Sequence, residues 1–284
     1  MNRRIKNKDK NTCMKPDKIK FDLINNAKDS LIHAVEHLTN PNGIKARDLK
    51  YAIRDVVHVV ELLLKERLRR VHPSFIWQDI DKYPSSTAYI IGISRSVERL
   101  CKLAGVSFAK DSKKTISACK TIRNSIEHYE FQLDFKKTKG IIGRMLSFIF
   151  DFSKRHLELD LEKEFRSDTR WDELINLYEF WEAHSTTLEK QLSEQKKPVC
   201  DCPSCGAVTY DISESKCLLC GNTEELVECD ECHNMVNESE TKTFDEVNED
   251  PESGVYGSYS LTICQNCIDE HIAEDMAIDS MKEG

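Results

Sequence analysis

The sequence contains no long run of apolar residues, although it is 284 residues long. Its most apolar stretch, 141–152, is interrupted by Arg144 and Asp151, whereas a helix that spans a bilayer needs about 20 mostly apolar residues. The start of the chain, MNRRIKNKDKNTC, is basic and lacks the apolar core of a signal peptide. We therefore expect a cytoplasmic protein that has no membrane partner.

Several enzyme signatures are also missing. The chain shows no glycine-rich phosphate loop, no Ser/His/Asp arrangement and no HExxH motif. Cys101 and Cys119 have no neighbouring residue that would activate a nucleophile, and we interpret them as buried small apolar residues. The chemistry, if the chain is an enzyme, must therefore come from another pattern.

Basic residues are scarce in the last third of the chain. Residues 198–284 contain 21 acidic and three basic residues, a net charge of −18, while the preceding residues contain 38 basic and 28 acidic ones, a net charge of +10. A basic part can attract polyanions, and an acidic part repels them or competes for the same surface. Two ordinary solvated surfaces would give the same composition.

The first two thirds of the chain contain apolar residues at helical spacing. This pattern predicts helices over about 24–38, 49–70, 85–104, 112–133 and 142–157, and a further helix that carries Trp171 to Trp181. We interpret the aromatic residues at this spacing as core packing. The polar segment 193–198 is expected to form a hinge between the helices and the cysteines that follow.

Nine of the twelve cysteines fall between residues 200 and 267, and eight of them form four Cys-x-x-Cys pairs. A two-residue gap lets one tight turn direct two thiolates at one ion, and two such turns complete the tetrahedral shell that zinc favours. Disulfides and an iron–sulfur cluster are the rival interpretations. The missing secretion signal disfavours the first, and the spacing suits zinc better than a ferredoxin cluster.

Each Cys-x-x-Cys pair with its tight turn is called a knuckle below. Sequential pairing of the four knuckles gives two sites, each with four thiolates. The first contains Cys202, Cys205, Cys217 and Cys220, and the second contains Cys229, Cys232, Cys264 and Cys267. The sequence leaves open an interleaved pairing. Cys200 is interpreted as a bystander and His233 as a weak substitute ligand. Because the assigned sites have no open coordination position, we expect two structural zinc ions.

A second motif lies upstream, where Arg123, Asn124 and His128 form an RNxxxH pattern on a predicted helix. Asn124 and His128 share a face, and Arg123 has the reach to join them. Arginine binds phosphate and histidine exchanges a proton near neutral pH, which suits metal-free RNA cleavage. The alternative is that Arg123 pairs with Glu127 and that His128 is an ordinary surface histidine.

Residues 20–192 resemble the HEPN family, an all-helical domain of prokaryotic toxins and defence ribonucleases. The resemblance rests on three features. They are the early helical pair with its second member DLKYAIRDVVHVVELLLKERL, the long aromatic connection after it (VHPSFIWQDIDKYP, residues 71–84), and RNSIEH at 123–128. It implies a metal-independent endoribonuclease whose composite site forms across a homodimer. It assigns phosphate binding to Arg123, proton transfer to His128, and orientation of the histidine or a phosphate contact to Asn124.

The resemblance does not extend to every feature of the family. Some HEPN toxins carry a tyrosine two residues after the histidine, where a partner enzyme modifies it. Here Glu130 occupies that position and Tyr129 precedes it. Regulation by modification at that tyrosine is therefore not expected in this chain.

Another pair of histidines, His33 and His37, has the i, i+4 spacing of a shared metal site. The sequence shows no third ligand, so we interpret the pair as part of a polar helix face.

Together these features predict a mainly α protein, a HEPN-like helical bundle followed by small four-cysteine zinc ribbons. The function expected is that of a dimeric toxin or antiviral defence effector that cleaves RNA and is regulated through its zinc region, where a regulatory protein could bind. A non-catalytic HEPN/zinc-ribbon adaptor for protein or RNA partners is the alternative. The expected parts are a basic mobile arm (1–17), the helical domain (18–195), the first ribbon (199–224), the second ribbon (225–272) and an acidic tail (273–284).

Overall fold

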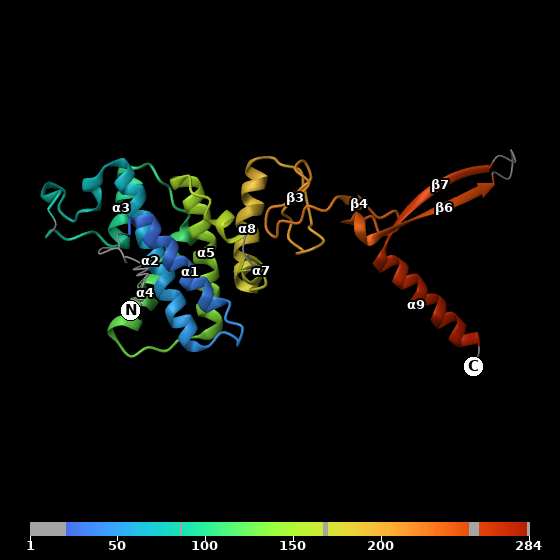
Figure 1. Ribbon diagram of the computed structural model, residues 1–284, viewed down its shortest axis with the longest axis horizontal. Coiled ribbons are helices and arrows are strands. Elements are labelled where there is room, and N and C mark those ends of the chain that lie inside the picture. Colours follow the sequence, from blue (N-terminus) through green and yellow to red (C-terminus); the bar gives the residue numbers. More distant parts are fainter. Residues whose placement is uncertain (1–20, 86, 167–169, 250–255, 283–284) are drawn as a thin grey trace, which may run out of the picture. The chain divides into compact units, whose positions relative to one another are not determined.

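The computed structural model describes residues 21–85, 87–166, 170–249 and 256–282 (Figure 1). By internal contacts the chain divides into unit 1, which contains residues up to 32 and 58–107, and unit 2, which contains 33–57 and 108 onward. The two first helices, α1 (Leu23–Leu38) and α2 (Ala46–Val71), contribute residues to both units. The predicted arm at 1–17 lies outside the described residues. The mainly helical class is confirmed.

Unit 1 is organised by an arginine that holds the aromatic connection. The guanidinium of Arg99 donates to the carbonyl oxygens of Phe75 and Trp77, both at 2.6 Å, and of Gln78 at 3.1 Å. Burial lowers the pKa of Arg99, and the three acceptors offset the cost of removing this charge from water. The connection contains the short helices η1 (Pro73–Ile76) and η2 (Ile80–Lys82), and Arg99 itself lies on α3 (Ile93–Leu103).

The predicted helix over 85–104 begins later than expected, at Ile93, and Cys101 on this helix is exposed rather than buried. The backbone before it pairs with the aromatic connection: the amide of Gln78 donates to Tyr89 at 2.8 Å, and the amide of Ile91 donates to Ile76 at 3.0 Å. The backbone groups of Tyr89 and Ile91 are therefore used in this local bridge and not in helical hydrogen bonds, so the helix begins only after the bridge ends.

Unit 2 is built around the contact between two helices at Gly143. A Cβ atom added to this glycine would lie 2.3 Å from the carbonyl oxygen of Glu179, so only glycine fits where the helices cross. Next to this crossing Phe150 packs edge-on against Trp171 and Phe180. The helices of this unit are α4 (Lys110–His128), α5 (Phe135–Leu157), α6 (Leu161–Arg166), α7 (Arg170–Ile175) and α8 (Tyr178–Glu194).

Two further helix predictions were partly wrong, one at the end of the helix and one in its middle. The helix expected over 112–133 ends at His128, because the chain turns at an extended Tyr129 and Asp134 then caps α5 by accepting from the amide of Lys137 at 2.7 Å. The helix expected through Trp171 and Trp181 is divided into α7 and α8, with Leu177 in an extended conformation between them.

The cysteine-rich part of unit 2 contains three small sheets and a final helix. The strands β1 to β3 form an antiparallel sheet, and the pairs β4–β5 and β6–β7 form hairpins. The boundary expected at residue 272 falls inside α9. The elements are β1 (Val199–Cys200), β2 (Tyr210–Asp211), β3 (Lys216–Cys217), β4 (Leu226–Glu228), β5 (Met235–Asn237), η3 (Glu238–Glu240), β6 (Thr241–Glu249), β7 (Tyr256–Cys264) and α9 (Gln265–Lys282). Across the described helices, none is both long and apolar enough to cross a membrane.

Candidate metal centres and candidate active site

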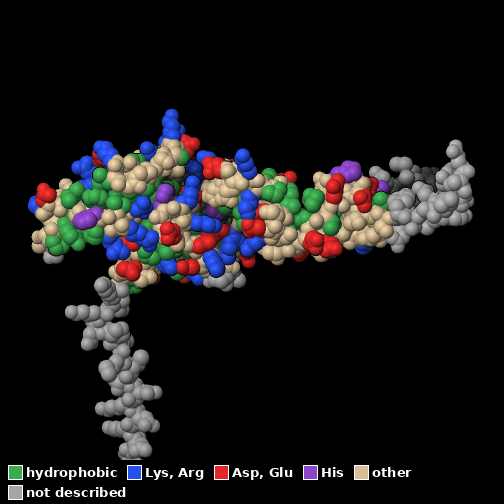
Figure 2. Space-filling model, turned by 90° about the horizontal axis from the view of Figure 1, so that it is seen from above, with side chains coloured by type: hydrophobic (Ala, Val, Ile, Leu, Met, Phe, Trp, Pro, Cys, Tyr) green, Lys and Arg blue, Asp and Glu red, His purple; other side chains and the backbone are tan. Residues whose placement is uncertain are grey.

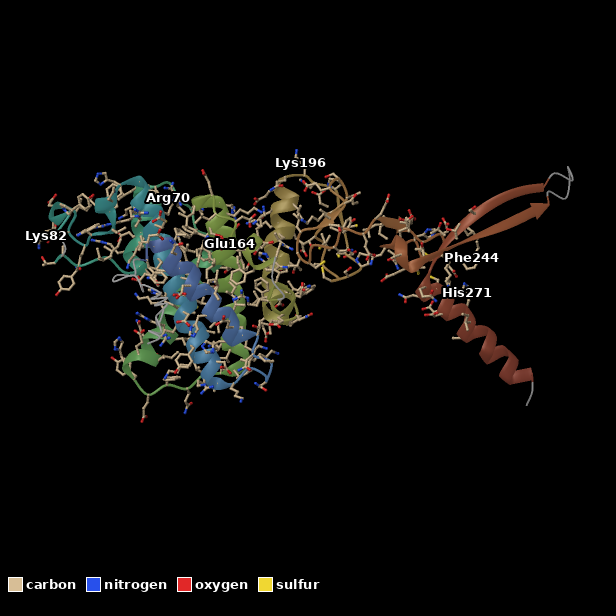
Figure 3. All side chains as sticks on the ribbon, in the orientation of Figure 1. Arg70, Lys82, Glu164, Lys196, Phe244 and His271 are labelled. Atoms are coloured by element: carbon tan, nitrogen blue, oxygen red, sulfur yellow. The ribbon has the colours of Figure 1, made fainter. Side chains whose placement is uncertain are left out.

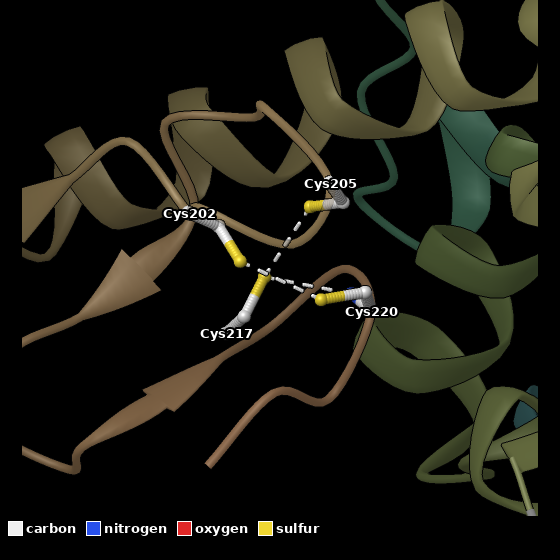
Figure 4. A group of neighbouring side chains, drawn as sticks. All are labelled: Cys202, Cys205, Cys217 and Cys220. Atoms are coloured by element: carbon white, nitrogen blue, oxygen red, sulfur yellow. Dashed lines mark hydrogen bonds between the residues drawn. The ribbon is translucent and has the colours of Figure 1, made fainter. Parts of the chain in front are cut away.

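The eight cysteines gather into two four-sulfur groups with sequential pairing. In the first group the Sγ atoms of Cys202 and Cys220 lie 3.6 Å apart, and those of Cys205 and Cys217 lie 3.8 Å apart (Figure 4). In the second group the corresponding separations are 4.0 Å for Cys229 and Cys267 and 3.9 Å for Cys232 and Cys264. A tetrahedral ion with thiolates at about 2.3 Å places its sulfurs about 3.8 Å apart. Both groups therefore have the geometry of a four-thiolate metal site.

Three of the four knuckles share the same backbone turn. The residue after the second cysteine adopts a left-handed conformation, and its amide donates to the carbonyl of the first cysteine at 2.8 to 3.0 Å. Gly206 and Gly221 take this position in the first group, and His233 takes it in the second. The His233 side chain is exposed, lies 3.2 Å from Glu228 and is outside the four-sulfur group. It shapes the knuckle rather than serving as a ligand.

The fourth knuckle is built differently, at the junction of β7 and α9. Cys264 ends the strand and Cys267 lies in the first turn of the helix. The amide of Cys264 donates to Cys229 Sγ at 3.3 Å, which links the two knuckles of the group. Among the described residues, the buried apolar cluster of this module consists of Cys229, Cys264 and Cys267, with Val236 and Ile263 half-buried against them. So small a core depends on a metal ion for its stability.

The thiols of the first group oppose one another's ionisation. A hydrogen bond from Cys205 lowers the pKa of Cys202 to about 6, while the contact with Cys202 raises the pKa of Cys205. One thiolate is therefore stabilised only while the neighbouring cysteine keeps its proton and donates it in a hydrogen bond. A divalent cation allows all four sulfurs to be thiolates at once, which is the chemistry that this donor set provides. Cys200 lies in β1, outside both groups.

The first four-cysteine module packs directly on the helices. Trp171 Nε1 donates to the carbonyl of Leu219 at 3.0 Å, and Trp181 Nε1 donates to that of Cys205 at 3.1 Å. Arg166 donates to the carbonyl of Leu218, the residue before Leu219. Sequence reasoning assigned both tryptophans to the core alone, although a buried indole N–H needs an acceptor and so signals a polar partner.

The segment expected to be a hinge is therefore held in place. Lys196, which follows α8 in Figure 3, has a left-handed φ of 54°, and its amide donates to Ser193. Lys197 donates to the buried carboxylate of Asp211 at 2.6 Å. These bonds join the last turn of α8 to the first sheet, so the module continues the helical part.

The RNxxxH residues lie in the last two turns of α4. Arg123 Nε is 2.8 Å from Glu127 Oε1, and its guanidinium approaches Asn124 Oδ1 at 3.4 Å. His128 is the last residue of the helix; its side chain is 65% exposed and lies 4.0 Å from Glu127. The structure thus brings the three predicted residues to one accessible helix end, with Glu127 as a fourth member that the i+4 spacing had indicated.

Lysines lie along α4, at the start of α5 and, at Lys50, against the segment that follows His128. On the face shown in Figure 2, Lys and Arg side chains gather over the helical part, and few lie over the cysteine-rich part. The lysine Lys50 on α2 lies over the ring of Phe131, three residues after His128, with 5.6 Å from Nζ to the ring centre. The exposed lysines on α4 and at the start of α5 are Lys110, Lys113, Lys114, Lys136 and Lys137. Such a surface attracts polyanions.

A third group that can hold a metal consists of His33, His37 and Asp55. The sequence indicated the two histidines by their spacing but not the carboxylate, because Asp55 lies on α2 and only the packing of α1 against α2 brings it near. The i, i+7 spacing of Asp48 and Asp55 on α2 was the available signal, since it places both carboxylates on one helix face.

Comparisons with known proteins add no relative: no family model, no curated protein and no solved structure matches the chain. The fold and the sites define a mainly helical protein with two four-cysteine metal-binding modules. The HEPN resemblance stays a prediction that rests on the motif and the order of the helices.

Proposed function

We propose that this chain is a metal-independent endoribonuclease of the HEPN type, a toxin or defence effector that acts as a homodimer in the cytoplasm and carries two structural zinc ions. The observation that carries the proposal is the accessible cluster of Arg123, Asn124 and His128 at the end of α4. A guanidinium that can donate hydrogen bonds to phosphate, an amide and a proton-transfer group gather there, close enough together to act on one phosphodiester.

The Arg123–Glu127 ion pair does not close this site. Both side chains are about one third exposed, and an exposed i, i+4 pair stabilises a helix by only about 0.3–0.5 kcal/mol. A phosphate that accepts two hydrogen bonds from the guanidinium forms a stronger contact. An RNA backbone can therefore take the place of Glu127.

A second copy of the chain would complete the site. None of residues 120–128 is fully buried, although this part of α4 includes Ile122 and Ile126, and Tyr129 after it is 76% exposed. These apolar side chains stay partly exposed in a single chain, on the helix that carries the RNxxxH residues. They fit a symmetric contact between two copies of the chain. Such a contact would bring two Arg123–His128 pairs together.

Zinc is the ion proposed for the four-cysteine groups because borderline-soft, redox-inert Zn²⁺ favours tetrahedral thiolate shells. These closed shells provide no position for a substrate. We therefore assign the cysteine-rich part a structural and regulatory role, and its acidic surface would compete with RNA for the basic helices.

The test is cleavage of a mixed RNA pool by the zinc-loaded protein, with excess Mg²⁺ chelated briefly so that the thiolate sites stay loaded. We expect cleavage by the wild type and a loss of at least about a hundredfold in His128→Ala and Arg123→Ala. Ser117→Ala, an exposed change on the same helix outside the motif and the lysines, is the matched control. Equal cleavage by all four proteins, or none by the wild type, would sink the proposal.

The second candidate is a non-catalytic adaptor, which the Arg123–Glu127 pair favours because it satisfies the motif without a substrate. In that case RNA or protein binding would persist in His128→Ala, and cleavage would be absent from every variant. Measuring binding and cleavage with the same RNA separates the two functions.

A further inference from the structure

Two histidines of α1 face two aspartates of α2 in an antiparallel arrangement. His33 Nδ1 lies 2.6 Å from Asp55 Oδ2, and His37 Nδ1 lies 3.2 Å from Asp48 Oδ1. The histidines are one helical turn apart and the aspartates are two turns apart. The geometry points to a third metal site in this chain, formed by His33, His37 and Asp55, which takes a divalent transition-metal ion of the zinc type.

The distances fit such an ion. One ligand atom from each of the three residues lies within 4.8 Å of the other two. Tetrahedral ligation by nitrogen and oxygen at about 2.0–2.2 Å requires ligand atoms about 3.4 Å apart. The His33–Asp55 contact would widen by less than about 1 Å, and the longer separations would shorten by side-chain rotation.

His37, the less exposed of the two histidines, is already oriented as a ligand. Its Nδ1 faces Asp48, a carboxylate that is 2% exposed and that accepts a hydrogen bond from the amide of Lys45 at 2.9 Å. Its Nε2 is buried and has no hydrogen-bond partner among the described residues. A metal-bound histidine commonly donates its other nitrogen to a carboxylate. Asp48 and His37 form this arrangement, and an ion would satisfy the remaining nitrogen.

The surroundings of Asp55 set the charge of the site. Arg54 Nε lies 3.3 Å from Asp55 Oδ1, which leaves Oδ2, on the His33 side, for the ion. Arg54 also lies over the ring of Tyr51, and that ring stacks on His37 at 5.1 Å. Two neutral imidazoles and one carboxylate suit zinc and similar ions better than magnesium or calcium, which prefer oxygen ligands.

The site differs in kind from the two thiolate groups. The His33 side chain is 50% exposed, and three protein ligands leave a coordination position for water. The ion would also join α1 to α2, so binding should raise the stability of the helical part. This inference does not depend on the ribonuclease proposal, because RNxxxH chemistry requires no metal.

The experiment counts metal ions per folded chain by native mass spectrometry after equilibration with a small excess of zinc. Three ions are expected in the wild type, two in His33→Gln and Asp55→Asn, and three in His58→Gln, which changes an exposed histidine on α2 outside the group. His33 is half exposed, so its replacement leaves the core intact, and a thermal melt of each variant verifies the fold.

Cobalt substitution provides a readout that the thiolate sites cannot imitate. A third Co²⁺ bound by imidazole and carboxylate should add absorption without the thiolate charge-transfer band, and His33→Gln should remove that addition alone. Two ions in the wild type, or three retained in both His33→Gln and Asp55→Asn, would overturn the inference whether or not the protein cleaves RNA.

Discussion

The Arg123–Glu127 ion pair places a competing carboxylate where the phosphate of a substrate would bind. Glu127→Gln should therefore raise kcat/KM for RNA cleavage by about two- to fivefold at low salt, because a contact worth about 0.3–0.5 kcal/mol and one repulsive charge are removed. The measurement is initial cleavage rate against RNA concentration. Glu130→Gln removes the same charge from an exposed residue two positions after the helix, and its rate should stay within about twofold of the wild type.

A decrease in kcat/KM for Glu127→Gln would contradict this view of the ion pair. It would mean that the carboxylate orients Arg123 or His128 productively, and the phosphate-binding surface would then have to be sought elsewhere on α4.

Gly143 tests the packing that positions the helical part. Gly143→Ala should destabilise the protein by roughly 1–3 kcal/mol, because the added methyl group meets the Glu179 carbonyl and two rigid backbones must separate. Gly140→Ala, one turn earlier on α5, meets only the end of the Arg144 side chain at 3.5 Å. It should be neutral or stabilise the helix by up to about 1 kcal/mol. Urea unfolding followed by circular dichroism measures both, and equal effects would contradict the close helix crossing.

At the scale of elements, the two four-cysteine modules should respond differently to loss of their ion. Cys264→Ser should remove one metal and the order of the β6–β7 hairpin, while the melting of the helices stays within about 2 °C of the wild type. Among the described residues, the buried apolar cluster of the second module consists of cysteines. On its described surface Phe244, labelled in Figure 3, is exposed, and so is Ile272.

Cys217→Ser should also lower the melting temperature of the helical part. Arg166, Trp171 and Trp181 all donate to carbonyls of the first module, and losing these acceptors costs roughly 2–4 kcal/mol in total. For a domain of this size that corresponds to about 5–10 °C. Thermal melts combined with metal counting check both variants, and identical melts would show that the first module is not coupled to the helices.

The elements differ in how far sequence could predict them. Helical periodicity located α1, α2 and the end of α5 well, although α5 begins at Phe135 and not near 142. Cys-x-x-Cys spacing located both sulfur groups, because this signal is local. The late start of α3 depended on backbone bonds from Gln78 to Tyr89 and from Ile91 to Ile76, which a window of apolar residues does not reveal. The division of α7 from α8 likewise depended on one extended residue, Leu177.

The candidate sites show the same limit. Arg123, Asn124 and His128 are close in sequence, so their grouping was predictable, whereas the docking of Trp171 and Trp181 on the cysteine knuckles joins segments 24 or more residues apart. Asp55 completes the histidine pair from another helix. Contacts between helices depend on crossing geometry, which hydrophobic periodicity does not specify.

At the scale of the whole molecule, the proposed composite site makes activity a property of the pair of chains. A homodimer of Arg123→Ala would hold two histidines and no phosphate-binding arginine, and a homodimer of His128→Ala would hold two arginines and no histidine. A mixed dimer would hold one of each at the shared site. Mixing the two inactive variants should then restore cleavage to a measurable fraction of the wild-type rate.

The amount restored discriminates between the arrangements. Random exchange makes about half of the dimers mixed, so restoration should rise as subunits exchange and should fall on dilution below the dimer dissociation constant. Sedimentation of the same samples measures the dimer directly. A second control mixes Arg123→Ala with the double variant Arg123→Ala/His128→Ala, which supplies no arginine and should stay inactive. If mixed dimers form and remain as inactive as either parent, each chain must use its own Arg123 and His128, and the half-exposed face of α4 serves another purpose than a shared site.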